Sequence, residues 1–256
     1  MKLTIDTDQR MLTVDDGAGA RALDLYGPEA FAVLSRQWLR TAWANKYTYT
    51  FTWLGRPVVQ LPEDLLRVQE AIFQLRPDLI VETGIAHGGS LVFYASLCQL
   101  LGVGRVVGVD VEIRPHNRAA LDAHPLRPLV TLIEGSSTAP ETLAQVHAQV
   151  RPGERVLVLL DSNHTYQHVS DELRAYAPLV TPDSYLVVQD GVMRDLADVP
   201  GGQPSWTEDN PVRAVDDFLR EHPELVLEPP AWAFNESPLR EGITHWPSGW
   251  LRRRRP

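Results

Sequence analysis

The hydrophobic pattern of the chain becomes regular at about residue 79. Short apolar runs rich in β-branched residues recur from there to about residue 189, without the polar alternation of a half-exposed strand. Such runs are typical of parallel strands that are buried on both faces. They predict strands at 79–83, 105–109, 129–134, 156–161 and 184–189.

Segments with helical spacing separate these runs. The predicted helices lie near 89–101, 115–123, 138–149 and 165–178. Strands and helices that alternate through short connections predict one α/β domain, a parallel sheet with helices on both faces. After a polar loop, the pattern predicts one more helix and two closing strands, at 210–221, 225–227 and 243–246.

The first 61 residues follow a different pattern. Residues 1–16 alternate as a small hairpin, which must pack on the main body or on another subunit because it is too small to be stable alone. A helix over 29–46 carries an apolar stripe, and the aromatic residues 47–53 are predicted to be extended. We therefore divide the chain into an N-terminal hairpin and helical extension, 1–61, which serves as a lid or in oligomerisation, and a main domain, 62–256, which begins with a helix to Leu75.

Composition limits the partners that we expect. The net charge of −9 argues against a nucleic-acid surface, and the basic residues Arg252 to Arg255 are expected to form a solvated tail. No apolar run is long enough to span a membrane and no signal sequence is visible, which predicts a cytoplasmic protein. The single cysteine, Cys98, lies in an apolar helix and is expected to be a buried, inert thiol.

The first buried strand ends in a turn that is suited to a ligand. Its sequence is Glu82-Thr83-Gly84, followed after three residues by Gly88-Gly89-Ser90. The glycines allow close approach of the backbone to a ligand, and the helix that follows offers free amides. The spacing differs from the dinucleotide fingerprint G-x-G-x-x-G and is similar to the first motif of S-adenosylmethionine (SAM) methyltransferases; the alternative is a plain packing turn.

The next strand ends carry polar groups as well. Ligands of open α/β sheets bind beyond the carboxyl ends of the strands. Asp110 follows the second strand, where an acid can accept hydrogen bonds from ribose hydroxyls, and two serines after the third strand can line an adenine pocket. The expected cofactor-binding residues are Glu82, Thr83, Gly84, Ser90, Asp110, Ser136, Ser137 and Asp161.

The fourth and fifth strands end in Asp161 and Asp190. Consecutive strands are usually neighbours, so the two carboxylates should meet, and they would repel each other unless a proton or a cation lies between them. Oxygen ligands favour Mg²⁺, and His164 is suited to accept a proton near neutral pH. The alternatives are that the aspartates cap turns and that His164 is an ordinary polar residue. His87 and His168 are weaker candidates.

Together these motifs resemble the cephalosporin hydroxylase family, from about Trp53 to the C-terminus. The matching stretches are Glu82-Thr83-Gly84 with Gly88-Gly89-Ser90, Asp161-Ser162-Asn163-His164, and Gln189-Asp190. Members of that family are SAM- and Mg²⁺-dependent O-methyltransferases of natural-product pathways, some of which act on sugars. The resemblance implies a Rossmann-like class I SAM-dependent methyltransferase fold with a mostly parallel seven-stranded sheet.

The resemblance also implies roles for individual residues. Asp161, Gln189 and Asp190 would hold the metal ion, and His164 together with Asp161 would be catalytic, His164 as the general base. Gln189 stands where the family has Glu, and its carbonyl can bind a metal but brings no charge. The implied substrate is a sugar or sugar nucleotide such as TDP-rhamnose, and a homo-oligomer is expected. The alternatives are an NAD-linked oxidoreductase or epimerase and a non-catalytic binding protein.

Overall fold

The computed structural model describes residues 1–255. The main body contains a seven-stranded sheet of order β11-β12-β10-β9-β6-β7-β8. Five strands are parallel: β6 (Leu79–Thr83), β7 (Arg105–Asp110), β8 (Val130–Glu134), β9 (Val156–Leu160) and β10 (Tyr185–Val188). The strands β11 (Leu225–Leu227) and β12 (Trp250–Arg253) are antiparallel to their neighbours. The predicted mostly parallel, Rossmann-like seven-stranded sheet is confirmed.

The order of the strands reverses between β6 and β9. From β6 the chain continues outward through β7 and β8, then returns to place β9 and β10 on the other side of β6. Every residue of β6, β9 and β10 is buried, which explains their unbroken apolar sequences. Such a reversal leaves a crevice at the carboxyl ends of the two strands, where ligands bind in open α/β sheets.

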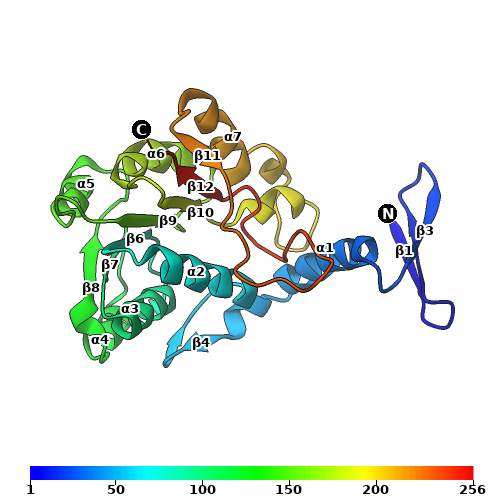
Figure 1. The fold of residues 1–256 in the computed structure, drawn as a ribbon, viewed down its shortest axis with the longest axis horizontal. Coiled ribbons are helices and arrows are strands. Elements are labelled where there is room, and N and C mark those ends of the chain that lie inside the picture. The colour runs from blue at the N-terminus through cyan, green and yellow to red at the C-terminus, as the bar shows by residue number, and fades with distance from the viewer. Residues whose placement is uncertain (256) are drawn as a thin grey trace.

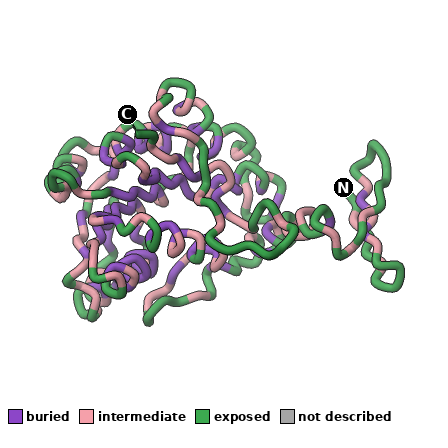
Figure 2. Tube along the Cα trace, viewed as in Figure 1, coloured by how far each residue is buried: buried purple, intermediate pink, exposed green. Residues whose placement is uncertain are grey.

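Helices cover both faces of this sheet (Figure 1). Alternate strand residues point to opposite faces, so Ile80 and Leu157 belong to one apolar cluster and Val81 and Val158 to the other. The first face packs on α2 (Pro62–Leu75), α3 (Gly89–Leu101) and α4 (Pro115–Asp122). The second packs on α5 (Pro140–His147), α6 (Tyr166–Tyr176) and α7 (Pro211–Glu221). Figure 2 shows the buried residues gathered on the sheet and on the inner sides of these helices.

The N-terminal segment stands apart from the main body. The predicted hairpin is confirmed as β1 (Lys2–Asp6) and β2 (Met11–Asp15), and a third strand that the sequence analysis missed, β3 (Ala20–Asp24), completes the small sheet. This sheet packs on the start of α1 (Pro28–Ala44) through Leu12, Val14 and Ala30. Figure 1 shows α1 as the connection between this sheet and the main body.

The aromatic segment 47–53 was predicted to be extended, and its first half is not. Tyr47–Thr50 forms the short 3₁₀ helix η1, and only the strand β4 (Thr52–Trp53) pairs with β5 (Arg56–Pro57). The Thr50 hydroxyl donates a hydrogen bond to the Tyr47 carbonyl, 2.7 Å away, and the Tyr47 ring packs edge-on against Trp38 and Phe51. Local side-chain bonds of this kind compete with strand pairing.

The predicted closing strand 243–246 is also wrong. Its backbone amides bind side chains and not a neighbouring strand: His245 N donates to Asp64 Oδ2 (2.8 Å) and Trp246 N to Thr244 Oγ1 (2.9 Å). The Thr244 hydroxyl in turn donates to Asp64 Oδ1 (2.5 Å). Asp64 of α2 therefore fixes this segment as a loop, and the last strand forms later, at β12.

Of the four arginines that were expected to form a solvated tail, only Arg254 and Arg255 are exposed, beyond the last strand. Arg252 and Arg253 are in β12, and Arg252 forms ion pairs with Asp183 (2.9 Å) and Glu228 (2.6 Å). Arg255 also pairs with Asp183. Carboxylates on the neighbouring turns thus order this end of the chain, as the sequence alone did not indicate.

Short 3₁₀ helices complete the fold. They are η2 (Arg127–Leu129), η3 (Ala177–Leu179), η4 (Gly191–Asp195) and η5 (Pro204–Thr207). Among residues 1–255, no helix has both the length and the apolar character needed to cross a membrane.

Candidate active site

Gly84 lies where the sheet order reverses. It follows β6 with a φ of +88°, and a Cβ placed on it would lie 1.9 Å from the Asp161 carbonyl oxygen. Two hydrogen bonds fix this approach, from Gly84 N to Val109 O (2.7 Å) and from Asp161 N to Thr83 O (2.9 Å). Only glycine fits here, so the ends of β6 and β9 can lie close together.

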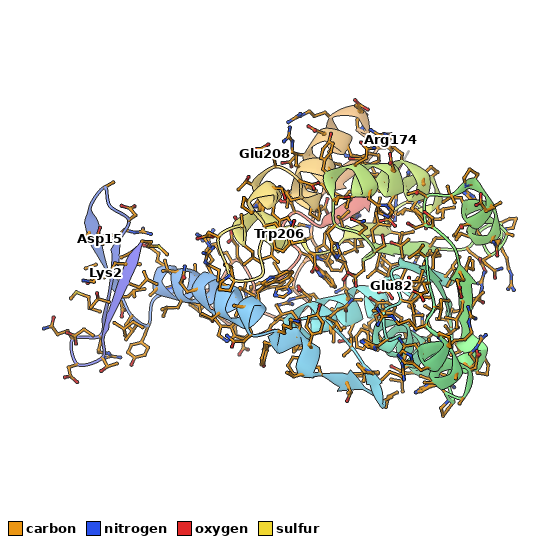
Figure 3. All side chains as sticks on the ribbon, turned by 180° about the vertical axis from the view of Figure 1, so that it is seen from behind. Lys2, Asp15, Glu82, Arg174, Trp206 and Glu208 are labelled. Atoms are coloured by element: carbon orange, nitrogen blue, oxygen red, sulfur yellow. The ribbon has the colours of Figure 1, made fainter. Side chains whose placement is uncertain are left out.

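Glu82 is fully buried just before this turn, inside the main body in Figure 3. Its carboxyl group accepts hydrogen bonds from the hydroxyls of Ser90 (2.5 Å) and Tyr94 (2.9 Å), so it ties β6 to α3. Burial raises the pKa of Glu82 to about 8. Two predicted cofactor residues, Glu82 and Ser90, are therefore bonded to each other. The Thr83 hydroxyl is also buried and has no partner in the described part of the chain.

Asp110 holds the turn that follows Gly84. Its Oδ2 accepts hydrogen bonds from Ile85 N (2.7 Å) and Ala86 N (3.2 Å). Ala86 has a φ of +44°, an uncommon conformation for a residue with a side chain, so the turn needs such support. A carboxylate has about four lone-pair sites, which leaves Asp110 able to accept further hydrogen bonds from a ligand.

Arg56 supports the same turn from the other side. Its Nε donates to the His87 carbonyl (3.0 Å) and its Nη2 to Asn117 Oδ1 (2.9 Å). Asn117 Nδ2 donates to the Ala86 carbonyl (2.9 Å). Burial lowers the pKa of Arg56. The sequence analysis missed Arg56 and Asn117, because neither belongs to a motif and their partners are about 30 residues away.

A polar network lies beyond β8 and β9. His168 Nε2 is 3.2 Å from Ser137 Oγ and 3.0 Å from Ser162 Oγ, and Ser162 Oγ donates to buried Glu172 (2.7 Å). The hydrogen bond with Glu172 raises the pKa of His168. His168 thus joins the predicted adenine side to the end of β9. Ser136 is partly exposed next to this network.

The structure brings Asp161, His164 and Asp190 together. One nitrogen or oxygen atom from each lies within 4.8 Å of the others. His164 Nε2 is 3.4 Å from Asp190 Oδ2 and 4.0 Å from Asp161 Oδ1, and each side chain is 23% exposed. The strands that carry the aspartates are paired, with Val188 opposite Leu160. Asp190 has a φ of +55° as the chain enters η4, a conformation that aspartate tolerates.

The electrostatics of this cluster favour a cation. Burial, and then the Asp190 carboxylate, raise the pKa of Asp161 well above its usual value. Two carboxylates this close are stabilised when a proton or a positive ion lies between them. Two carboxylates with an imidazole or an amide oxygen form a donor set that suits a hard divalent ion.

Gln189 lies beside the cluster and is bonded to another glutamine. Its Oε1 accepts a hydrogen bond from Gln60 Nε2 (3.0 Å), which is also 3.5 Å from Asp161 Oδ2. Both glutamines are buried, and Gln189 Nε2 and Gln60 Oε1 have no partner among residues 1–255. The Gln189 carbonyl oxygen has a second lone pair, so it can still bind a metal ion. No pattern in the sequence pointed to Gln60.

Two aromatic segments, the loop 192–210 and residues 47–53, are packed against the main body. Trp206 of the loop 192–210 contacts Trp43, with ring centroids 5.9 Å apart, close to the body end of α1 (Figure 3). Trp53 donates through Nε1 to Ser96 of α3 (3.0 Å). The His245 ring is buried 5.8 Å from Trp43, and burial lowers its pKa. Trp43, Trp206 and His245 thus lie beside η4, which directly follows Asp190, whereas Trp53 packs on α3.

The fold and the site define the class of protein to which the chain belongs. The fold is an open parallel sheet with a glycine turn where the strand order reverses, and the site is a cluster of two aspartates and a histidine. The chain is a SAM-dependent O-methyltransferase. Residues 45–254 match the family described as rhamnosyl O-methyltransferase/CmcI, and the chain belongs to this family.

The sequences of two rhamnosyl O-methyltransferases support this family assignment. The chain is 31% identical over 176 residues to the rhamnosyl O-methyltransferase of Mycobacterium tuberculosis (strain ATCC 25618 / H37Rv), with 67% of each chain covered. It is 28% identical over 193 residues to that of Mycobacterium leprae (strain TN), covering 74% of this chain and 80% of the relative.

Solved structures share the fold. The apo structure of CmcI-N160 superposes with a TM-score of 0.54 at 17% identity, covering 81% of this chain and 78% of CmcI. The structure described as cmcI-D160 Mg-SAM gives a TM-score of 0.52 at 16% identity, with 80% and 77% covered. At these identities the likeness shows the fold alone.

Proposed function

We propose that the chain transfers the methyl group of SAM to a hydroxyl group of a sugar, with the help of a divalent metal ion. The observation that carries this proposal is the convergence of Asp161, His164 and Asp190 beside the Gly84 turn. The printed names of the relatives, rhamnosyl O-methyltransferases, support a sugar acceptor. Family membership also favours methyl transfer over the NAD-linked alternative.

The cofactor would lie on the turn after β6. When bound, SAM supplies an activated methyl group on its positively charged sulfur. Asp110 would accept hydrogen bonds from the ribose, and the backbone of Thr83 and Gly84 would contact the cofactor directly. Glu82 and Ser90 would act through the hydrogen bond that fixes this turn to α3. Ser136 and Ser137 would line the adenine side.

The metal ion, Mg²⁺, would be held by Asp161 and Asp190, with the Gln189 carbonyl as the third protein ligand. When bound, the ion supplies Lewis-acid stabilisation of the charge that develops on the attacked oxygen. The raised pKa of Asp161 supports this placement, because a cation would offset the burial and the Asp190 repulsion that disfavour the charged carboxylate. Since Gln189 is neutral, the site has less negative charge than one built with Glu, and its affinity for Mg²⁺ would be lower.

His164 would act as the general base. Its Nε2 lies 3.4 Å from Asp190 Oδ2, so a carboxylate stands beside the imidazolium that forms when His164 takes the proton of the sugar hydroxyl. Asp161 and Asp190 would orient the ring and the acceptor, which is the main contribution that a methyl-transfer site makes.

We further propose that the acceptor is a nucleotide-activated deoxysugar in natural-product biosynthesis. TDP-rhamnose is the first candidate, since the sequence resembles the TDP-rhamnose 3-O-methyltransferase of calicheamicin biosynthesis. The cytoplasm is the proposed location, because sugar nucleotides and SAM are made there.

A direct assay separates the candidate functions. The full chain is incubated with SAM and TDP-rhamnose, with Mg²⁺ or with EDTA, and the methylated product is measured by mass spectrometry. We expect turnover that falls with EDTA and is lost in His164→Gln. Titration calorimetry with SAM and with NAD provides the second readout. Binding of NAD without SAM would refute the proposal, and SAM binding without turnover on any sugar would support a non-catalytic protein.

The N-terminal extension, residues 1–61, is proposed to join copies of the chain. Its three-stranded sheet has two open edges and leaves Ile5 and Tyr26 more than half exposed. Although one face of the sheet packs on α1, its unpaired strand edges can pair with a strand of another copy. Light scattering should give a multiple of the chain mass, 28.7 kDa, that decreases in the Ile5→Asp/Tyr26→Asp variant. The control Phe73→Asp, an exposed position on α2, should keep the mass of the wild type.

A further inference from the structure

A cavity of about 840 Å³ lies on the side of the main body that α1 reaches. Its walls come from three segments far apart in sequence: α1, η4 and the C-terminal loop 238–247. Figure 1 shows this loop, in orange to red, crossing the body next to α1. The volume lies within the range of roughly 300–1,000 Å³ that is typical of small-molecule sites.

Arginines from all three segments line this cavity. They are Arg36, Arg40, Arg194 and Arg240, together with the carboxylates of Glu29, Asp195 and Glu241. Among residues 1–255, Arg36 and Arg240 form no ion pair, and Arg194 pairs only with its neighbour Asp195, at 3.6 Å. Only Arg40 is firmly held, by Asp198 of the loop after η4 (2.8 Å). The four arginines exceed the three carboxylates of the lining by one positive charge, in a chain of net charge −9. The three guanidinium groups that no other element holds are available to an anionic ligand.

Much of the remaining wall is apolar, although Ser35 and Thr244 also line it. Phe31 and Leu39 of α1, Val192 of η4, and Leu239 and Ile243 of the loop all line the cavity. A ligand that fills it would therefore have a charged part for the arginines and a flat or apolar part for these side chains. A nucleoside diphosphate has both.

The cavity and the proposed metal site share one element of the chain, the short helix η4. Asp190 directly precedes η4, and Arg194 lies within η4. The Val192 amide donates to the His245 carbonyl (3.0 Å), so η4 and the loop are held together at the end nearest Asp190. A molecule in the cavity would thus contact the short helix that directly follows Asp190.

We propose that this cavity binds the nucleoside diphosphate part of the acceptor, with Arg36, Arg194 and Arg240 on the diphosphate and the apolar wall on the base. This inference rests on the proposed function, in which a sugar nucleotide is the acceptor. Guanidinium groups bind phosphate oxygens in a bidentate manner, which suits a diphosphate better than single point charges do. The sugar would then project from the cavity to the metal site.

Arg213 provides a matched control. It pairs with Glu208 and lies over the Tyr166 ring, 5.6 Å from its centroid. It does not line the cavity. Arg213→Ala removes the same charge from the chain and should leave nucleotide binding unchanged.

The test is titration calorimetry of the full chain with TDP and with thymidine. We expect TDP to bind and thymidine to bind much more weakly. Arg194→Ala and Arg36→Ala/Arg240→Ala should each weaken TDP binding about tenfold or more, since each removes charge-assisted hydrogen bonds. A wild type that does not bind TDP, thymidine that binds as tightly as TDP, or an equal loss in Arg213→Ala would overturn the inference.

Kinetics separate this inference from the methyl-transfer proposal. The cavity variants should raise the KM for TDP-rhamnose but leave turnover of an uncharged methyl rhamnoside close to that of the wild type. If the wild type methylates the rhamnoside and does not bind TDP, the cavity inference fails and the proposed function stands. If TDP binds in the cavity and no sugar is methylated, the proposed function fails instead.

Discussion

Replacement of Gly84 by alanine tests whether the contact between β6 and β9 sets the geometry of the proposed metal site. The new Cβ would lie 1.9 Å from the Asp161 carbonyl oxygen and 2.6 Å from its carbonyl carbon. Real Cβ atoms essentially never come closer than 3.0 Å, so the backbone of Asp161 must move by about 1 Å. The atom in the way belongs to the backbone, and no rotamer change can relieve the clash.

Gly153 is the matched control. Its φ is +82°, close to the +88° of Gly84, but no atom lies within 4 Å of a Cβ placed on it. Both alanine variants carry the cost of a left-handed conformation, about 1–2 kcal/mol. Only Gly84→Ala adds overpacking in a buried region, which costs about 1–3 kcal/mol more. Urea unfolding followed by tryptophan fluorescence measures this difference.

The displacement of Asp161 should also affect function. A shift of about 1 Å at a positioned group can lower the rate by up to about a hundredfold. We therefore expect weaker Mg²⁺ binding and a large loss of methyl transfer in Gly84→Ala, and wild-type values for both in Gly153→Ala. Equal stability losses in the two variants, or a Gly84→Ala protein with unchanged Mg²⁺ affinity, would refute this reasoning.

Three further predictions concern Glu82, Gln189 and Arg56. The raised pKa of Glu82 gives a contribution to folding stability that is complete below about pH 4.5 and is lost as the pH rises to about 8. Denaturation midpoints measured across this pH range should therefore show Glu82→Gln gaining stability relative to the wild type as the pH rises. A difference in midpoint that stays constant with pH would contradict the pKa shift. Gln189→Glu restores a charged ligand, so calorimetry should show Mg²⁺ binding about tenfold tighter, whereas unchanged affinity would exclude this side chain as a ligand. Arg56→Ala frees the turn at His87 and should weaken SAM binding about tenfold, with Arg67→Ala, which breaks a surface pair with Glu70, as the control that must not do so.

The buried strands were predictable because their signal is local. The apolar sequences of β6, β9 and β10 require cover on both faces, wherever they lie in the fold. The prediction of a strand at 243–246 was wrong because the conformation of this segment depends on Asp64. Asp64 lies 181 residues before His245 and accepts the hydrogen bond of the His245 backbone amide. The basic end of the chain was misjudged for the same reason, since Asp183 and Glu228 are remote in sequence from Arg252.

The residues of the candidate site were likewise predictable only where their placement follows from the order of the strands. The meeting of Asp161 and Asp190 followed from topology, because consecutive parallel strands bring their carboxyl ends to one edge. Arg56 and Gln60 were not predictable, since each acts through one long-range contact made after the sheet has formed. Gln60 lies 129 residues before its partner Gln189, and no spacing rule connects the two.

The glutamine pair bears on why the side chain at position 189, the proposed third ligand, is neutral. A single hydrogen bond between two buried amides leaves groups on both without partners, whichever way each amide is turned. Each such group costs about 1–3 kcal/mol, so Gln189 does not improve stability through its hydrogen bonds. Its advantage is electrostatic, because a third carboxylate next to Asp161 and Asp190 would increase the repulsion that already raises the pKa of Asp161. A neutral side chain at this position thus limits the repulsion within the cluster, and in the proposed metal site weaker metal binding would be the consequence.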